Sequence, residues 1–358
     1  MKLSLSFVKP GMVLKTPVYS NRGGFLLKAG YVLTDSYIQK LKSMGILAVN
    51  IQEALDVDTE EADKILEDEV KLETLVLVQD FIEKKFSDDN YHSLVKAVEN
   101  IVEEILSGKI PAGGLAEISA YDSYTYAHSV DVCALSVAIG YHMGFFRPLL
   151  LRLGMGSLLH DLGKTRIPLE ILNKPGELTS EEQEKMREHP LLGYNIVINE
   201  FKGKLEAQAL QIIMNHHERY DGSGYPNSLK GSQLSTLDMI CGIADMYSAM
   251  TSDRVYRKAF PYSEAYEMLL GSADSYFSID IVQAFAKSVE PYPTGTFVQM
   301  SDGRKGYVIK SNPHLPTRPS VKILSTEEIV DLSKNLSLVI KSQLPQEEVS
   351  TLVEMRDV

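Results

Sequence analysis

Apolar residues recur three and four residues apart through the middle of the chain, a spacing typical of amphipathic helices. The clearest series is Ile65, Val70, Leu72, Leu75, Val76, Phe81, Ile82, Leu94, Val98, Ile101, Val102 and Ile105. Pro/Gly turns divide the region, and Thr179 to Glu182 form a capping box for a helix that should end near His189-Pro190. We predict a helical connector over residues 57–108 and a helical bundle over residues 109–290.

The first 56 residues have a different pattern, that of a small α+β module. Val18-Tyr19 and Phe25–Leu27 flank a polar, glycine-containing segment, which predicts a β-hairpin. Thr34 can cap a helix that runs to Gly45, and the residues from Ile46 to Ile51 should form a strand. The module carries no catalytic pattern, so we interpret it as regulatory or as an adaptor.

A third pattern begins after Pro291-Tyr292-Pro293. Short apolar pieces at residues 296–298, 306–309 and 321–324 are separated by Gly, Asn and Pro, as in a small β-rich domain, with a barrel as one option. Residues 291–358 should form this domain. The predicted fold class is therefore mainly α: a helical bundle with a small N-terminal α+β module and a small C-terminal β-rich domain.

The composition is that of a globular protein, with 44% hydrophobic and 23% charged residues. The longest weakly charged run, Val132 to Phe146, is too short for a membrane span and should be a buried helix. The N-terminus lacks the apolar stretch of a signal peptide. Cys133 and Cys241 lie in apolar surroundings, where small core residues are expected rather than a disulfide. We predict a cytoplasmic protein without membrane insertion.

The net charge of −12 argues against a nucleic-acid polymer or an anionic membrane as the main partner. Basic residues nevertheless cluster near the chemical motifs of the bundle. They are Lys164, Arg166, Lys174, Arg219, Arg254, Arg257 and Lys258. A cationic pocket on an acidic protein suits a small phosphate ester.

Histidine is unevenly placed. Of the eight histidines in the chain, five lie within the predicted bundle beside polar or glycine-rich patterns: His128, His160, His189, His216 and His217. One histidine on an apolar helix is more often a core residue than a ligand. Five of them, together with two aspartates in apolar surroundings, favour a metal site over coincidence.

Two aspartates support the interpretation as a metal site. Asp161 follows a largely apolar segment, and Asp245 lies within another. Burying an ionised carboxylate is costly unless a cation compensates it. Seven nitrogen and oxygen ligands exceed the four of a tetrahedral zinc site and suit two metal ions of higher coordination. The ligands recur about one helix and loop apart, as expected when several helices of a bundle converge.

At this point the sequence resembles a known family. His160–Lys164, with Ile167-Pro168 and Lys174–Gly176 after it, is similar to the signature of HD-domain metal phosphohydrolases, and His216–Pro226 resembles the motif that names the HD-GYP family. Flanking segments at residues 124–129 and 244–258 resemble it too. The similarity covers roughly residues 95–290.

The resemblance implies a helical bundle with a metal centre that hydrolyses cyclic di-GMP to pGpG, GMP or both by metal-activated hydroxide attack. The implied ligands are His128, His160, Asp161, His189, His216, His217 and Asp245, with Asp161 as the bridge, and the metals would be iron or manganese. Relatives with a third metal use a glutamate four residues before the first histidine. Tyr124 stands there, so we expect a dinuclear centre.

Further residues acquire expected roles from the same resemblance. Asp161 and Lys164 would serve catalysis, Lys164 by supporting a phosphate or the nucleophile. Its alternative is a plain ion pair with Asp161, three residues away. Arg254 and Arg257 would hold substrate phosphate, and Gly224 and Tyr225 would present a ring to a guanine base. A tyrosine that merely packs on the bundle is an equal alternative.

One position departs from the family pattern: Ser248 stands where a second aspartate is usual. Residues around metal ligands tune affinity and rate, so one rival is a weakly active or inactive module that senses cyclic di-GMP or docks onto a diguanylate cyclase of the GGDEF type. A second rival is a phosphodiesterase for another nucleotide, such as cyclic GMP-AMP or a monoester, and a third is a histidine-rich structural bundle. The oligomeric state stays open.

Overall fold

The computed structural model describes residues 2–5, 8–14, 18–19, 25–28, 30–43, 46, 48–52, 74, 77–78, 81, 88–107, 124–252, 259–345 and 348–349. The chain divides into two compact units. One comprises Met1–Asp63, Ala116–Tyr124 and Tyr292–Val358, and the other comprises Lys64–Leu115 and Thr125–Pro291.

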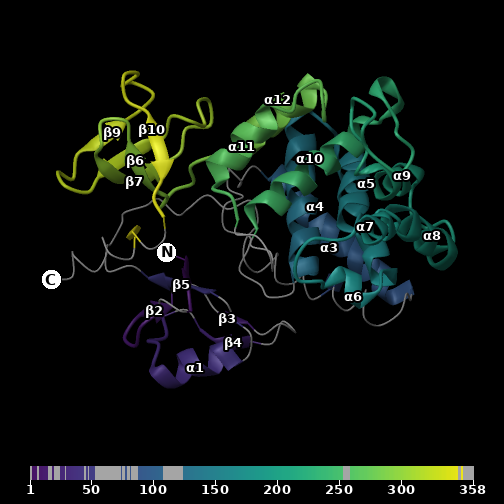
Figure 1. Ribbon diagram of the computed structural model, residues 1–358, viewed down its shortest axis with the longest axis horizontal. Helices are drawn as coiled ribbons and strands as arrows, with labels where there is room; N and C mark the ends of the chain where they lie inside the picture. Colours follow the sequence, from purple (N-terminus) through teal and green to yellow (C-terminus); the bar gives the residue numbers. More distant parts are fainter. Residues whose placement is uncertain are drawn as a thin grey trace. The chain divides into compact units, whose positions relative to one another are not determined.

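The second unit is a helical bundle, drawn in blue to green in Figure 1. Its described elements are α3 (Asp88–Leu106), α4 (Tyr124–His142), α5 (Arg147–Leu158), η1 (Leu162–Arg166), α6 (Leu169–Leu172), α7 (Ser180–Met186), α8 (His189–Phe201), α9 (Ala207–Asn215), η2 (Gly231–Gln233), α10 (Thr236–Thr251), α11 (Tyr262–Leu270) and α12 (Ile279–Ser288).

Helices α4 and α10 form the centre of this bundle. Residues 127–140 of α4 and 237–245 of α10 are buried without interruption. A helix that is buried on all sides must be surrounded by protein, and α10 packs against α5, α9, α11 and α12. Helix α5 packs against α3 and α9, and η1 packs against α8. The mainly α fold class is confirmed.

One helix boundary differs from the prediction. The capping box at Thr179 is present, but α7 ends at Met186, and His189 begins the next helix, α8. Pro190 explains the difference, because proline lacks an N–H and fits the first turn of a helix better than its interior. His189 is therefore held at the N-terminal end of a helix.

The close approach of η1 to α8 depends on Gly163. A Cβ atom at this position would overlap the carbonyl oxygen of His189 and the backbone nitrogen of Gly193. Only glycine therefore allows the segment after Asp161 to lie against the start of α8. The contact fixes the distance between two parts of the chain that carry predicted metal ligands.

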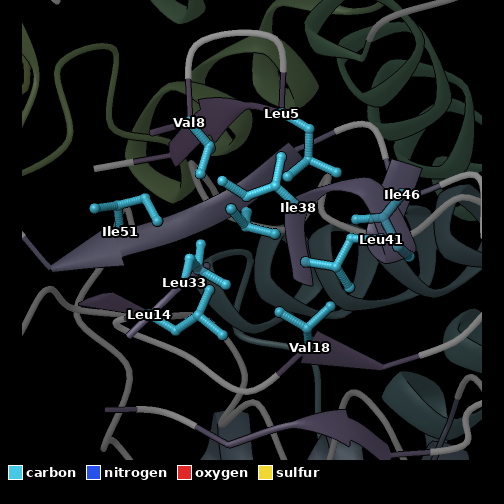
Figure 2. Packing of buried hydrophobic residues seen from close by; sticks show 10 residues of the cluster. Leu5, Val8, Leu14, Val18, Leu33, Ile38, Leu41, Ile46 and Ile51 are labelled. Atoms are coloured by element: carbon cyan, nitrogen blue, oxygen red, sulfur yellow. The ribbon is translucent and has the colours of Figure 1, made fainter. Parts of the chain in front are cut away.

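The elements of the N-terminal module are β1 (Lys2–Ser4), β2 (Val13–Leu14), β3 (Val18–Tyr19), β4 (Phe25–Leu27), α1 (Asp35–Ser43) and β5 (Ala48–Gln52). The sequence predicts β3, β4, α1 and β5, whereas β1 and β2 were not predicted. Strands β3 and β4 form the hairpin, and the sheet order is β1-β5-β2. The Thr34 hydroxyl accepts the N–H of Tyr37 and caps α1. Figure 2 shows Leu14, Leu33 and Ile38 in the core of this module.

The C-terminal residues form an antiparallel sheet in the order β10-β6-β7-β8-β9. Its strands are β6 (Phe297–Met300), β7 (Lys305–Lys310), β8 (Ser320–Ile323), β9 (Ile329–Asp331) and β10 (Ile340–Gln343). A buried cluster that includes Val298, Val308, Val321 and Val330 holds the sheet. The β-rich domain is confirmed, and β9 and β10 are its edges in the described part of the chain.

Cys133 and Cys241 are free and buried, as small core residues are. Among the described residues, no helix combines the length and the apolar character needed to cross a bilayer.

Gly163→Ala should destabilise the helical unit by at least about 3 kcal/mol, because the new methyl group overlaps backbone atoms that cannot rotate away. Urea unfolding in the presence of chelator would measure this separately from any effect of metal. Gly271→Ala is the matched control, since its Cβ would meet only ordinary contacts. Equal unfolding free energies for the two variants would contradict the prediction.

Candidate metal centre

The helical unit brings all of the predicted ligands together. Three overlapping groups of side chains have ligand atoms within 4.8 Å of one another: Asp161, His189, His216 and His217; His128, His160 and Asp161; and His160, His216 and Asp245. His128 lies on α4, Asp245 lies on α10, and the others lie at or next to helix ends. The other three histidines of the chain, His92, His142 and His314, are in none of these groups.

Three of the imidazoles are oriented by one repeated contact. The Nδ1 atoms of His160, His189 and His216 lie 2.7, 2.8 and 3.0 Å from the carbonyl oxygens three residues earlier. A carbonyl only accepts, so each Nδ1 carries the proton and each Nε2 keeps a lone pair. The Nε2 atoms of His189 and His216 lie 3.2 Å apart and point to the same place. This is the tautomer that a metal ligand requires.

The carboxylate of Asp161 lies between two sets of imidazoles. Its Oδ1 atom is 3.3 Å from Nε2 of His189 and 4.0 Å from Nε2 of His216. Its Oδ2 atom is 3.3 Å from Nε2 of His160 and 3.8 Å from Nε2 of His128. Each oxygen therefore faces its own pair of nitrogens, which is the geometry that a bridging carboxylate needs.

Asp245 occupies the other side of the cluster. Its Oδ1 atom lies 3.0 Å from Nε2 of His128, and its Oδ2 atom lies 3.8 Å from Nδ1 of His217. The second nitrogen of His128, Nδ1, is 2.9 Å from the hydroxyl of Ser248. Ser248 therefore contacts a predicted ligand directly and fixes the orientation of its ring.

The cluster contains buried polar atoms that its own side chains do not satisfy. His160 and Asp161 are 0% and 4% exposed, yet Nε2 of His160 and Oδ1 of Asp161 have no hydrogen-bond partner in the described part of the chain. Unsatisfied buried groups of this kind are rare in native proteins. A bound cation would satisfy both atoms, so the residues present fit a metal centre.

The protonation states of these groups also suit metal binding. Burial lowers the pKa of His189 to about 4 and that of His217 to about 3. Burial likewise lowers the pKa of His216, with a further contribution from His217. Burial would raise the pKa of Asp161, but His160 and other cationic neighbours hold it well below its ordinary value. A charged carboxylate and neutral imidazoles at pH 7 are what metal ligands require.

The side chain of Lys164 compensates the charge of Asp161. The Nζ atom of Lys164 lies 2.5 Å from Oδ2 of Asp161, so the ion pair weighed as an alternative role is present. Burial lowers the pKa of His160, but the adjacent carboxylate of Asp161 outweighs it and leaves the pKa raised. The catalytic role of Lys164 stays a prediction.

The loop that follows His217 is fixed by main-chain contacts. Glu218 is buried, and its carboxylate accepts the N–H groups of Asn227 at 2.6 Å and Leu229 at 2.9 Å. A Cβ at Gly224 would overlap the backbone of Glu218, so a glycine is required there. The sequence offered no separate signal for Glu218, because an anchoring carboxylate and a solvent-exposed one look alike in a motif.

Tyr225 belongs to this loop and packs on the cluster. Its ring stacks on the imidazole of His217, with centroids 4.7 Å apart and planes inclined by 23°. This is the packing alternative for Tyr225, and the expected contact with a base stays a prediction. The guanidinium of Arg187 lies over the same ring, 5.3 Å from its centroid.

The basic residues near the motifs of the bundle have different surroundings. Arg166 pairs with Glu200 at 3.3 Å, and Lys174 pairs with Glu182 at 2.6 Å, so their charges are already compensated. Arg254 and Arg257 lie outside the described residues. Arg187 was not among the basic residues selected from the sequence, because nothing in the sequence places it over Tyr225.

Comparison with known proteins agrees with this geometry. Residues 114–281 match the model of an HD domain, and residues 297–352 match that of a KOW domain associated with HD domains. The fold resembles that of an HDG"Y"P protein from Bdellovibrio bacteriovorus, with a TM-score of 0.54 and 19% identity over 80% of this chain and 98% of the other. At that identity the likeness concerns the fold.

Similar curated proteins are named as phosphodiesterases of cyclic dinucleotides. A cyclic di-GMP phosphodiesterase of Pseudomonas aeruginosa is 34% identical over 66% of this chain and 58% of its own length. One from Thermotoga maritima is 37% identical over 46% of this chain and 45% of its own length. A 3'3'-cGAMP-specific phosphodiesterase of Vibrio cholerae is 31% identical over 54% of this chain and 46% of its own length.

Fold and site together define an HD-domain protein with a clustered histidine and aspartate centre. Within that class, the match to the HD-domain model and the similarity to curated cyclic di-GMP phosphodiesterases support the HD-GYP family that the motifs indicate. The chain spans about half of the length of the curated relatives it matches.

Ser248→Ala should weaken metal retention about 10- to 100-fold, because it removes the hydroxyl that holds His128 in place. Metal per chain after dialysis against graded chelator would measure this. Ser136→Ala is the matched control: it is also a buried serine on a central helix, and its hydroxyl has no hydrogen-bond partner among the described residues. Unchanged retention in Ser248→Ala would show that the contact does not matter.

Proposed function

We propose that this chain is a metal-dependent phosphodiesterase that hydrolyses cyclic di-GMP to pGpG, GMP or both. The observation that carries the proposal is the position of Asp161, whose two oxygens face two different pairs of imidazole nitrogens. The similarity to curated cyclic di-GMP phosphodiesterases supplies the substrate. We propose the activity and the substrate of this chain on the basis of this geometry and this similarity.

The ligand atoms suit a dinuclear centre. His189, His216 and His217 would hold one cation, and His128 and His160 would contribute to the other, with Asp161 shared between them. Asp245 would complete the set. Two cations at such a site supply a nucleophile at neutral pH and stabilise the attacking and leaving oxygens of a phosphoryl transfer. Imidazole and carboxylate ligands suit iron and manganese, which we propose as the metals.

The chain's own residues would orient this chemistry. The backbone carbonyls that bind Nδ1 of His160, His189 and His216 keep those rings from rotating. Lys164 lies beside Asp161 and can donate to a phosphate oxygen, which would offset negative charge in the transition state. Arg254 and Arg257 remain candidates for substrate phosphate, and Tyr225 with Gly224 for the base.

A second substrate has one specific observation in its favour. The Vibrio cholerae relative named for 3'3'-cGAMP matches more than half of this chain at 31% identity. Cyclic GMP-AMP has the same two phosphodiesters as cyclic di-GMP and differs in one base. The metal centre acts on the phosphodiester, so selectivity would have to come from residues that contact the bases.

Asp161→Ala should abolish turnover, with a loss on the order of 10³-fold or more, because the metal ions supply several kcal/mol of stabilisation to the transition state. The measurement is hydrolysis of cyclic di-GMP by protein purified without oxygen, with metal content determined on the same sample. Asp280→Ala, an exposed aspartate on α12, is the control.

The outcomes of this experiment separate the possibilities. Turnover with about two metal ions per chain, lost in Asp161→Ala, supports the proposal. Two metal ions without turnover of any cyclic dinucleotide would point to a sensor. Faster hydrolysis of cyclic GMP-AMP than of cyclic di-GMP would reassign the substrate. A fully active Asp161→Ala variant would exclude the proposed centre.

A further inference from the structure

The guanidinium of Arg187 lies beside the candidate metal centre, and no role was predicted for this residue. It is the C-terminal cap residue of α7 and is exposed. His189, a predicted ligand, follows two residues later. The Cζ atom of Arg187 lies 5.3 Å from the centroid of the Tyr225 ring, within the range of a cation–π contact.

The charge of Arg187 is available, unlike that of its basic neighbours. Lys185, on the same helix, pairs with Glu188 at 2.7 Å, and Lys174 pairs with Glu182. Within the described ranges, no carboxylate pairs with Arg187. A guanidinium offers five N–H donors in a planar fork, and only an anion or a set of acceptors uses them fully.

Arg187 also lies where the cluster is accessible. The side chain of His217 is 25% exposed, whereas those of His160 and His189 are at most 1% exposed. The cluster therefore opens at His217, and Tyr225 stacks on that ring. Because Arg187 contacts Tyr225, its guanidinium lies beside this opening.

We propose that Arg187 binds the phosphodiester of a cyclic dinucleotide that is not being hydrolysed; this rests on the proposed function. A cyclic dinucleotide carries two phosphodiester anions. When one lies on the metal centre, the other remains outside the ligand cluster and needs its own counter-charge. Arg187 supplies that charge and can bind two phosphate oxygens at once. The Tyr225 ring orders the guanidinium before the substrate arrives, which reduces the entropy lost on binding.

The test compares two substrates on the metal-loaded full chain. Cyclic di-GMP carries a second phosphodiester, and bis(p-nitrophenyl) phosphate carries only the one that is cut. For Arg187→Ala we expect the KM for cyclic di-GMP to rise about tenfold, the usual effect of losing a charge-assisted hydrogen bond, with kcat changed less than about twofold. Hydrolysis of bis(p-nitrophenyl) phosphate should not change. Arg187→Lys should recover part of the loss, because it keeps the charge.

Controls exclude indirect effects. Lys185→Ala removes a charge from the same helix that Glu188 already compensates, and it should leave both substrates unaffected. Metal content and thermal stability of Arg187→Ala should equal those of the wild type, since the side chain is exposed. An equal loss with both substrates, or a loss with cyclic di-GMP that is absent with cyclic di-AMP, would overturn the phosphate assignment. The second result would place Arg187 on a guanine base.

Calorimetric binding of cyclic di-GMP separates this proposal from the proposed function. If the wild type binds the dinucleotide without cutting it, the hydrolysis proposal fails. The ratio of the wild-type and Arg187→Ala dissociation constants still decides the role of Arg187: a ratio of about ten supports it, and equal constants refute it. A wild type that neither binds nor cuts cyclic di-GMP would refute both.

Discussion

The buried negative charge of Asp161 is the constraint on which the helical unit depends. An ionised carboxylate inside a packed bundle is unfavourable unless positive charge surrounds it. Lys164 pairs with this carboxylate, and four imidazoles lie around its two oxygens, where a bound cation would add the remaining positive charge. Several helices must therefore end or pass at one point, and the close contact at Gly163 keeps them there. Asp161 thus links the fold to the proposed chemistry, because the imidazoles that surround its carboxylate are also the candidate metal ligands.

Helix ends contribute more to this centre than helix faces do. His160, His189 and His216 each lie at or next to a helix end, where the carbonyl three residues earlier accepts from Nδ1. The backbone thus performs the orienting task that carboxylates often perform around metal ligands. His128 is oriented by Ser248, the position at which this chain departs from the family pattern. A hydroxyl carries no charge. A hydrogen bond to Ser248 therefore leaves the imidazole of His128 a weaker electron-pair donor to a metal than a hydrogen bond to an aspartate would.

Most elements and the clustering of the candidate ligands could be predicted from the sequence, because both depend on local or chemical signals. The capping residues Thr34 and Thr179, the hairpin between β3 and β4, and the apolar period of the helices are such signals. Histidine and aspartate in apolar surroundings indicate a metal site because of their chemistry. The position of Arg187 over Tyr225 and the anchoring role of Glu218 could not be predicted, because each results from packing between segments whose approach no local pattern encodes. The sequence did not predict that a helix begins at His189. Pro190 did not decide this, because a proline is compatible both with a helix that ends before it and with a helix that begins there.

The anchoring of the loop by Glu218 has a consequence for how such a protein can diversify. The carboxylate binds main-chain N–H groups at Asn227 and Leu229, and main-chain groups are the same whatever side chains those positions carry. The loop therefore keeps its shape while its outward side chains are exchanged. Under the proposed function, a rigid frame with exchangeable side chains would let base preference change through point mutations without moving His217, on which Tyr225 of this loop stacks.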